Sequence, residues 1–175
     1  MSRDSRLGAL SQCLSALTQK VVSIHAAWKL LAMIHSFYIY DRHCECIYSR
    51  DYVEGTINKN NDSDTSKLLF GILYSLKNIA SKLGDSESLS NSMKSFATGG
   101  MRVHMMELAT GLRFVLVSGL EVDNLQGVLH ELYTSHYLKW VVYNGLSPVE
   151  MKNQKIGGMF VSETDKYLQA VSSSM

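Results

Sequence analysis

The feature that most constrains the fold is a run of aromatic and β-branched residues that begins directly after Met33. The run extends from Ile34 to Tyr48 and is interrupted by a polar triplet at 41–43. Aromatic and β-branched side chains suit a pleated, half-buried surface, and the polar interruption falls where a tight turn would reverse the chain. The sequence therefore predicts that the folded domain opens with a β-hairpin near residue 33.

The size and charge of the chain indicate one globular domain. A chain of 175 residues can bury roughly 70% of its unfolded surface, and 46% apolar with 19% charged residues is typical of a folded protein. The formal net charge of +1 provides no general field that would attract nucleic acid. The positive excess lies in residues 1–34, which carry four basic side chains and one acidic one.

Residues 1–34 differ from the remainder in composition. They are rich in serine, and Leu7, Leu10, Leu14 and Leu17 recur at the spacing of one helix face. An amphipathic helix or a mitochondrial transit peptide would have this pattern. We interpret residues 1–34 as an extension that is poorly ordered or not part of the domain, and residues 35–175 as a single domain.

The remaining chain alternates between strand and helix patterns. A helix is predicted from a cap at Ser63 or Asp64 to Gly84, after a polar loop. Three short runs separated by glycines predict strands at 93–98, 101–108 and 112–118. A long helix at 122–144 and a short helix capped by Ser162 complete the chain. The order β-β-α-β-β-β-α-α predicts an α+β domain with a five-stranded antiparallel sheet flanked by helices.

The candidates for chemistry in the chain are weak. His43, Cys44 and Cys46 are soft metal ligands, but Cys-x-Cys lacks the usual spacer, and small buried thiols on one sheet face are the preferred interpretation. His130 and His136 fit packing on the long helix better than a catalytic base. Gly99, Gly100 and Gly111 resemble hairpin turns more than a phosphate loop. We therefore predict a binding module without catalytic residues, metal or cofactor, and the three cysteines indicate a reducing compartment.

Several motifs resemble one known family when taken together and in order. They are Phe37-Tyr-Ile-Tyr-Asp-Arg-His-Cys-Glu-Cys-Ile47, Lys67-Leu-Leu-Phe-Gly71, Arg102-Val-His104, Phe114-Val-Leu-Val-Ser118 and Leu146-Ser-Pro148. This combination is similar to the smallest core subunit of the TRAPP tethering complex, of the fungal type, over nearly all of residues 33–172. Residues 1–34 have no counterpart in that pattern, and Met101 replaces a common aromatic residue.

The resemblance implies a longin-like (profilin-like, sedlin-type) fold, which agrees with the element order. It also implies a non-catalytic subunit of a vesicle tether that acts as guanine-nucleotide exchange factor for a Rab GTPase in endoplasmic reticulum to Golgi transport. The partners would be other TRAPP subunits, including a longin-like paralogue, and the GTPase through the assembled complex. Such a protein would be cytoplasmic and peripheral at the cis-Golgi and endoplasmic reticulum. The nearly neutral chain favours membrane attachment through its partners.

Two groups of residues are candidates for partner contact: Asp41, Arg42 and His43 in the first turn, and Leu68, Phe70 and Tyr74 on the first helix. The turn residues match the family motif, although Asp41 and Arg42 could instead shape the turn through local hydrogen bonds. The helix residues lie away from the main apolar stripe of Leu69, Ile72, Leu73, Leu76, Ile79, Ala80 and Leu83. They suit either a subunit interface or a helix buried on two sides.

Two other classes stay open at this point. A longin-type small subunit of a clathrin-adaptor or coat complex would have the same element order, although Asp41-Arg42-His43-Cys44 departs from the turn of that pattern. A metal-dependent enzyme that uses His43, Cys44 and Cys46 would couple metal binding to folding.

Overall fold

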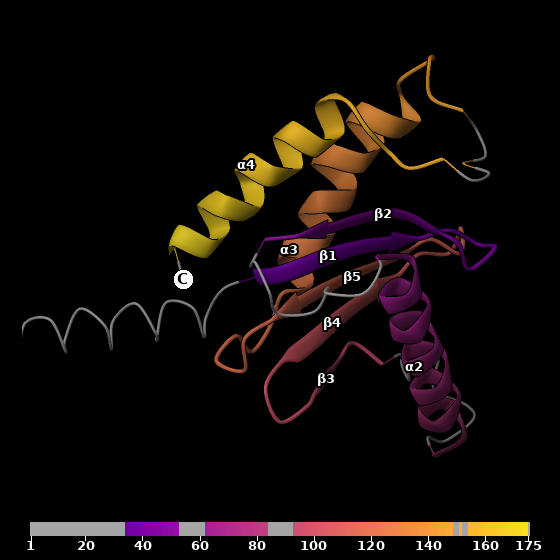
Figure 1. The fold of residues 1–175 in the computed structure, drawn as a ribbon, viewed down its shortest axis with the longest axis vertical. Helices are drawn as coiled ribbons and strands as arrows, with labels where there is room; N and C mark the ends of the chain where they lie inside the picture. Colours follow the sequence, from indigo (N-terminus) through magenta and orange to yellow (C-terminus); the bar gives the residue numbers. More distant parts are fainter. Residues whose placement is uncertain (1–33, 53–61, 84–92, 149–150, 152–153, 175) are drawn as a thin grey trace, which may run out of the picture.

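The computed structural model describes residues 34–52, 62–83, 93–148, 151 and 154–174. The elements in chain order are β1 (Ile34–Tyr40), β2 (Cys46–Asp51), α2 (Asp62–Leu83), β3 (Ser95–Ala97), β4 (Arg102–Glu107), β5 (Arg113–Ser118), α3 (Gln126–Glu131), η1 (Leu132–Val142) and α4 (Met159–Ser174) (Figure 1). The helix considered for 7–17 lies outside the described residues. The element order agrees with the prediction, because η1 directly continues α3.

The five strands form one antiparallel sheet in the order β2-β1-β5-β4-β3. β1 lies between β2 and β5, and all seven of its residues are buried. The aromatic run at the start of the domain is therefore an interior strand that is covered on both faces. The predicted longin-like architecture, a five-stranded antiparallel sheet flanked by helices, is confirmed.

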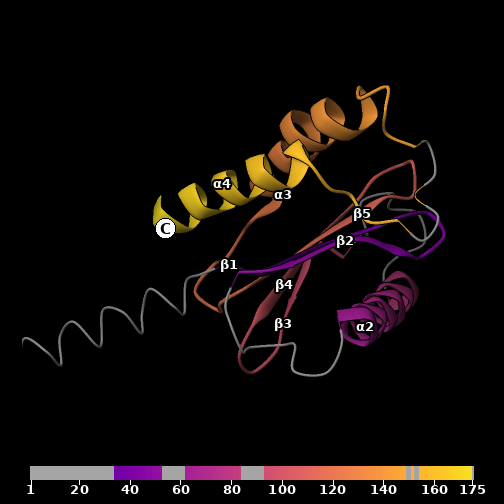
Figure 2. The same cartoon turned by 45° about the horizontal axis from the view of Figure 1, so that its top comes forward.

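Successive residues of β1 face opposite layers, as expected for a strand. Phe37 and Ile39 join a core cluster with α3, η1 and α4, whereas Tyr38 and Tyr40 join a second cluster beneath α2. Figure 2 shows the sheet between these two layers, with α3 and α4 on one side and α2 on the other. We call the side under α3, η1 and α4 the closed face and the side under α2 the α2 face.

Aromatic rings hold the closed face together. The ring of Phe114 lies 5.9 Å from Tyr133 and 5.4 Å from Tyr137 in edge-on contacts, and Tyr48 meets Phe160 at 5.2 Å. Such pairs contribute about 0.5–1.5 kcal/mol each beyond the burial of their area. This layer is therefore a packed core rather than a contact surface.

The predicted helix caps are wrong. α2 begins at Asp62, so Ser63 and Asp64 lie inside the helix. α4 begins at Met159, and the Ser162 hydroxyl donates to the Met159 carbonyl from within its first turn. Serine and aspartate often cap helices, but the same side chains also bond within a first turn, so composition alone did not locate these ends.

The long helix expected at 122–144 is shorter and changes its winding. It starts at Gln126, because Val122 and Leu125 are buried in the preceding segment and Asn124 accepts a bond from the Gln126 amide. From Leu132 the winding is π-helical, and the Tyr143 amide reaches back five residues to the Leu138 carbonyl. Within the described ranges, no helix is long and apolar enough to span a lipid bilayer.

Candidate functional site: two exposed contact surfaces

The turn between β1 and β2 is shaped by Asp41. Its carboxylate accepts hydrogen bonds from the amides of His43 and Glu45, each at 2.8 Å, and its own amide donates to the Glu45 carbonyl. Arg42 and His43 are exposed, and the Arg42 Nε lies 3.2 Å from the His43 ring. The three predicted contact residues therefore differ in role. Asp41 accepts the hydrogen bonds that shape the turn, whereas the side chains of Arg42 and His43 are exposed to solvent.

A second hairpin turn lies against this first turn. Gly111 connects β4 and β5 with a φ of +86°, and a Cβ at this position would lie 2.9 Å from the Cβ of Arg42. Glycine is required there both for the left-handed backbone and for the close approach. By contrast, Gly99 and Gly100, which were also predicted as turn glycines, have no left-handed backbone. The first turn is thus supported by a neighbouring, well-fixed turn.

Two cavities flank the first turn. One of about 200 Å³ lies between the two hairpin turns and η1, and is lined by Asp41, His43 and Tyr137 among others. Burial raises the pKa of the Tyr137 hydroxyl, to which Tyr133 and the Asp41 charge also contribute. The other cavity, of about 380 Å³, lies between the turn and α2 and includes Lys67 and Lys155. We call the exposed turn with its two cavities the turn surface.

The predicted pair of buried thiols on one sheet face is wrong for Cys44. This residue lies in the turn with a φ of +67° and is exposed, whereas Cys46 begins β2 and its thiol donates to the Tyr48 carbonyl at 3.1 Å. In the described ranges, His, Cys, Asp and Glu side chains form no group of three or more that could hold a metal ion. The turn therefore offers no assembled ligand set around Cys44.

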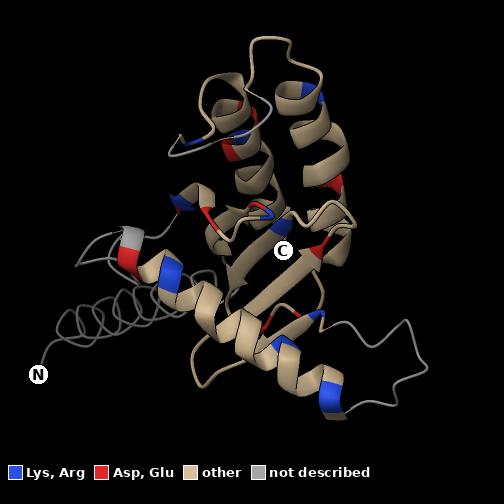
Figure 3. Cartoon of the chain, turned by 90° about the vertical axis from the view of Figure 1, so that its right-hand side faces the viewer, with Lys and Arg blue, Asp and Glu red and all other residues tan. Residues whose placement is uncertain are grey.

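α2 carries a second apolar stripe that does not contact the sheet. Leu68 is 70% exposed, Leu83 is 83% exposed, and Ile72 and Ile79 are at least half exposed. At 100° per residue these four positions lie within about 60° of one another, along roughly 22 Å of helix. Figure 3 shows the middle of α2 without charged residues. We call Leu68, Ile72, Ile79 and Leu83 the α2 seam.

The predicted helix candidates only partly match this seam. Leu68 belongs to it, and Tyr74 is exposed on another side of α2. Phe70 is half-buried, with its ring 5.3 Å from Tyr40 and the Arg113 guanidinium 5.4 Å from its centre. The prediction that Ile72, Ile79 and Leu83 belong to the buried stripe is wrong, since only Leu73 of that stripe is fully buried.

The position of α2 is fixed at two points along its length. Near its start, the Tyr40 hydroxyl donates to the Ser66 carbonyl at 2.8 Å. Further along, Lys77 forms an ion pair with Glu107, which also binds Arg113 at 3.1 Å. Because both ties lie on the sheet side, the helix is held firmly while the α2 seam faces outward.

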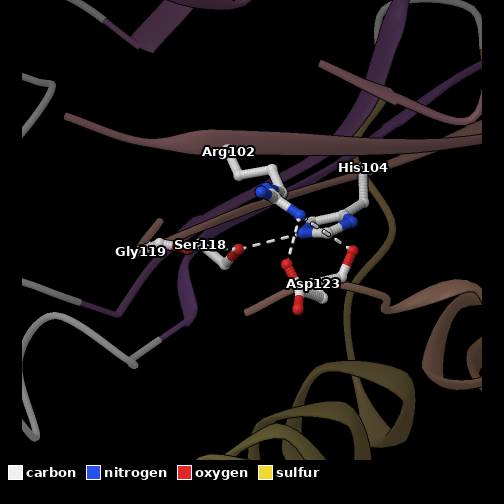
Figure 4. A network of polar contacts seen from close by, with 5 residues as sticks. All are labelled: Arg102, His104, Ser118, Gly119 and Asp123. Carbon is white, nitrogen blue, oxygen red and sulfur yellow. Dashed lines mark hydrogen bonds and ion pairs between the residues drawn. The ribbon is translucent and has the colours of Figure 1, made fainter. Parts of the chain in front are cut away.

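A polar network where β4 begins and β5 ends resembles a catalytic pair but is buried (Figure 4). The Ser118 hydroxyl donates to the Gly119 carbonyl, so the His104 Nε2 donates to Ser118 at 3.0 Å. Burial and the nearby Arg102 charge lower the pKa of His104. Arg102 in turn binds both the carboxylate and the carbonyl of Asp123. Since His104 is fully buried, this network fixes the segment before α3 rather than a substrate.

The other histidines considered for catalysis lie apart. The His136 ring packs 4.9 Å from the Tyr167 ring, which agrees with the packing interpretation. His130 is exposed on α3. The described side chains thus offer two exposed surfaces that are candidates for partner contact, the turn surface and the α2 seam.

Comparison with known families gives this arrangement a context. Residues 34–171 match the Sybindin-like family, and the chain belongs to this family. The matched range coincides with the sheet and its helices from the first residue of β1 into α4.

Individual relatives are subunits of one kind of complex. The chain is 40% identical over 123 residues to "Trafficking protein particle complex subunit BET5" of Saccharomyces cerevisiae, covering 67% of this chain and 77% of that protein. It is 27% identical to "Transport protein particle subunit bet5" of Schizosaccharomyces pombe, over 79% and 97% of the two chains. It is 26% identical to "Trafficking protein particle complex subunit 1" of Homo sapiens, over 79% and 93%. The resemblance deduced from the motifs is confirmed.

Matches among solved structures include MglB of Myxococcus xanthus, at 9% identity and a TM-score of 0.38, covering 81% of this chain and 85% of that one. MglB of Thermus thermophilus has 17% identity and a TM-score of 0.40, covering 64% and 81%.

Proposed function

We propose that the chain is a core subunit of a TRAPP complex, a vesicle tether and guanine-nucleotide exchange factor for a Rab GTPase of the early secretory pathway. The relationship to the yeast subunit carries this proposal, because 40% identity extends over most of the domain. The family match weighs against the alternative of a clathrin-adaptor or coat subunit. In this role the protein is cytoplasmic and peripheral at the cis-Golgi and endoplasmic reticulum.

The α2 seam is the surface we assign to a neighbouring subunit, with a longin-like paralogue as the expected partner. An exposed apolar stripe on a firmly tied helix suits a lasting protein contact, because its burial removes apolar area from water without reorganising the domain. Leu68 and Leu83 mark the two ends of this contact.

The turn surface is the part we assign to the composite GTPase-binding surface. Arg42, Lys67 and Lys155 outnumber Asp41 and Glu45 on it, and this small positive excess favours an acidic region of a partner. Nucleotide exchange requires no covalent chemistry by this subunit. It requires contacts that bind the nucleotide-free GTPase better than the loaded form.

The test is purification of the tagged full-length chain from cells with and without the substitution Ile79→Asp in the α2 seam. We expect the unaltered chain to recover other TRAPP subunits and the variant to recover at least about tenfold less, because a charge buried in an interface costs several kcal/mol. His130→Asp on the exposed side of α3 is the matched control. Recovery of adaptor large chains instead of TRAPP subunits would refute the proposal.

Exchange activity provides the second readout. The purified complex should accelerate release of a fluorescent guanine nucleotide from an early-secretory Rab GTPase. Arg42→Glu in the turn surface should slow release while leaving the set of copurifying subunits unchanged. An unchanged release rate would remove the turn surface from the GTPase contact.

A further inference from the structure

The connection between η1 and α4 ends in exposed apolar side chains that neither contact surface uses. Leu146 is 94% exposed and Tyr143 is 77% exposed, and Val142, Pro148 and Met159 are also exposed. In Figure 3 the chain that leaves η1 lies at the top of the view, beyond the two helices, and the connection returns to the sheet only near Ile156, whose amide donates to the Ile47 carbonyl. We call these five residues the tip.

The tip has a defined conformation. The Ser147 amide donates to the Asn144 carbonyl at 2.9 Å, and the Leu146 amide donates to the Asn144 side chain at 3.1 Å. The Asn144 turn therefore holds Leu146 outward. An exposed leucine that is fixed in this way differs from an apolar residue in a loop that could fold back onto the core.

Between Glu131 and Glu150, the segment that leads into and forms most of the tip carries a single charged side chain, Lys139. Residues 132–148 contain no aspartate or glutamate, and Lys139 lies one turn before Val142. The Lys139 ammonium lies 4.8 Å from the centre of the Trp140 ring. On neighbouring α4, the Glu163 carboxylate forms an ion pair with the Lys166 ammonium at 2.8 Å. A protruding aromatic and aliphatic end with a lysine and a tryptophan directly behind it has the composition of an interfacial membrane anchor.

We propose that the tip inserts into the interface of an anionic lipid membrane, with Tyr143 and Leu146 at the acyl boundary and Lys139 facing the headgroups. Exposure and charge favour lipid over a protein pocket, because Tyr143 and Leu146 are more than three-quarters exposed and Lys139 precedes Val142 by one helical turn, as in an apolar layer with a basic residue beside it. The inference is independent of the proposed function. It adds a direct contact to the attachment through partners that the near-neutral net charge favours.

Binding of the purified full-length chain to vesicles tests this proposal. Sedimentation with vesicles of phosphatidylcholine plus phosphatidylserine should exceed sedimentation with phosphatidylcholine alone. The double substitution Tyr143→Ser and Leu146→Ser should lower partition onto the anionic vesicles by at least about tenfold, since each side chain loses its apolar burial. Lys139→Gln should lower it by roughly fivefold at low salt and leave partition onto neutral vesicles unchanged.

Tyr74→Ser is the matched control, because Tyr74 is exposed like Tyr143 but lies on α2 outside the α2 seam. It should leave vesicle binding unchanged. Equal losses for the tip and the Tyr74 variants, or no binding of the unaltered chain to anionic vesicles, would overturn the inference. Loss of copurifying subunits on substitution of Leu146 would show that the tip fits a protein pocket instead. Since none of these outcomes depends on Ile79→Asp, failure of the membrane contact is distinguishable from failure of the proposed function.

Discussion

The two faces of the sheet are covered to different degrees. The closed face is buried under α3, η1 and α4 by interlocking rings, whereas α2 covers the other face with one side and exposes the α2 seam with the other. In the closed layer the apolar side chains serve folding, and on α2 many of them remain available for a partner. The difference shows that α3, η1 and α4 turn their apolar side chains mainly inward, whereas α2 divides its apolar side chains between the core and the solvent.

The largest expected effect is a break in the closed face at Phe114. Phe114→Ala removes the ring that contacts Phe37, Tyr133 and Tyr137, so we expect a loss of about 3–5 kcal/mol in the free energy of unfolding. Urea unfolding followed by circular dichroism measures it. A loss below about 1 kcal/mol would contradict the description of this layer as the main core.

The next effect lies beneath α2. Leu73→Ala opens a cavity at the one fully buried position of the apolar stripe and should cost about 2–4 kcal/mol. Leu83→Ala at the exposed end should change stability by less than about 0.5 kcal/mol. Chemical denaturation of the two variants in parallel measures the contrast. Equal losses would mean that the α2 seam is packed against the domain after all.

A smaller effect is expected at the first turn. Asp41→Ala leaves the amides of His43 and Glu45 without their acceptor and should cost about 1 kcal/mol. Asp41→Asn retains an acceptor oxygen and should recover most of that loss. Thermal unfolding of both variants checks this, and identical melting temperatures for Ala and Asn would contradict the role of the carboxylate in shaping the turn.

The smallest expected effect is a shallow pH dependence that arises at His104 on the closed face. Burial lowers the folded-state pKa below the ordinary value of 6.5, so the unfolded chain takes up a proton first as the pH falls. The contribution of His104 to the free energy of unfolding should be fully present above the ordinary pKa of 6.5 and should decline as the pH falls below 6.5.

Melting temperatures measured between neutral and mildly acidic pH test this dependence. His104→Gln should flatten the decline, while His43→Gln at the exposed turn serves as control. A steeper decline in His104→Gln than in the unaltered chain would contradict the assignment.

The sequence predicted the elements well and their environments less well. The run of aromatic and β-branched residues located β1, but it predicted a half-buried strand, whereas all seven residues of β1 are buried. Helix periodicity located α2, but it contains two overlapping apolar stripes, and spacing alone does not tell which of them faces the sheet. Ile72 and Ile79 were therefore assigned to the wrong side.

The site was less predictable for similar reasons. The exposure of Arg42 and His43 follows from their place in a turn, and was expected. The close approach of Gly111 to Arg42 depends on residues far apart in the chain, which no local pattern reports. The change to π-helical winding at Leu132 likewise has no signal in composition or period.

The central place of β1 has a consequence for synthesis on the ribosome. β1 can pair with β2 as soon as both strands have emerged from the ribosome. Its other edge can pair only with β5, which emerges after residues 52–112 have been synthesised. At ~5–20 residues per second, an apolar strand stays unpaired on one edge for roughly 3–12 s. A two-stranded hairpin has little stability of its own. During this interval the nascent chain is most exposed to pairing with other unfinished chains, and chaperones that cover strand edges would matter most then.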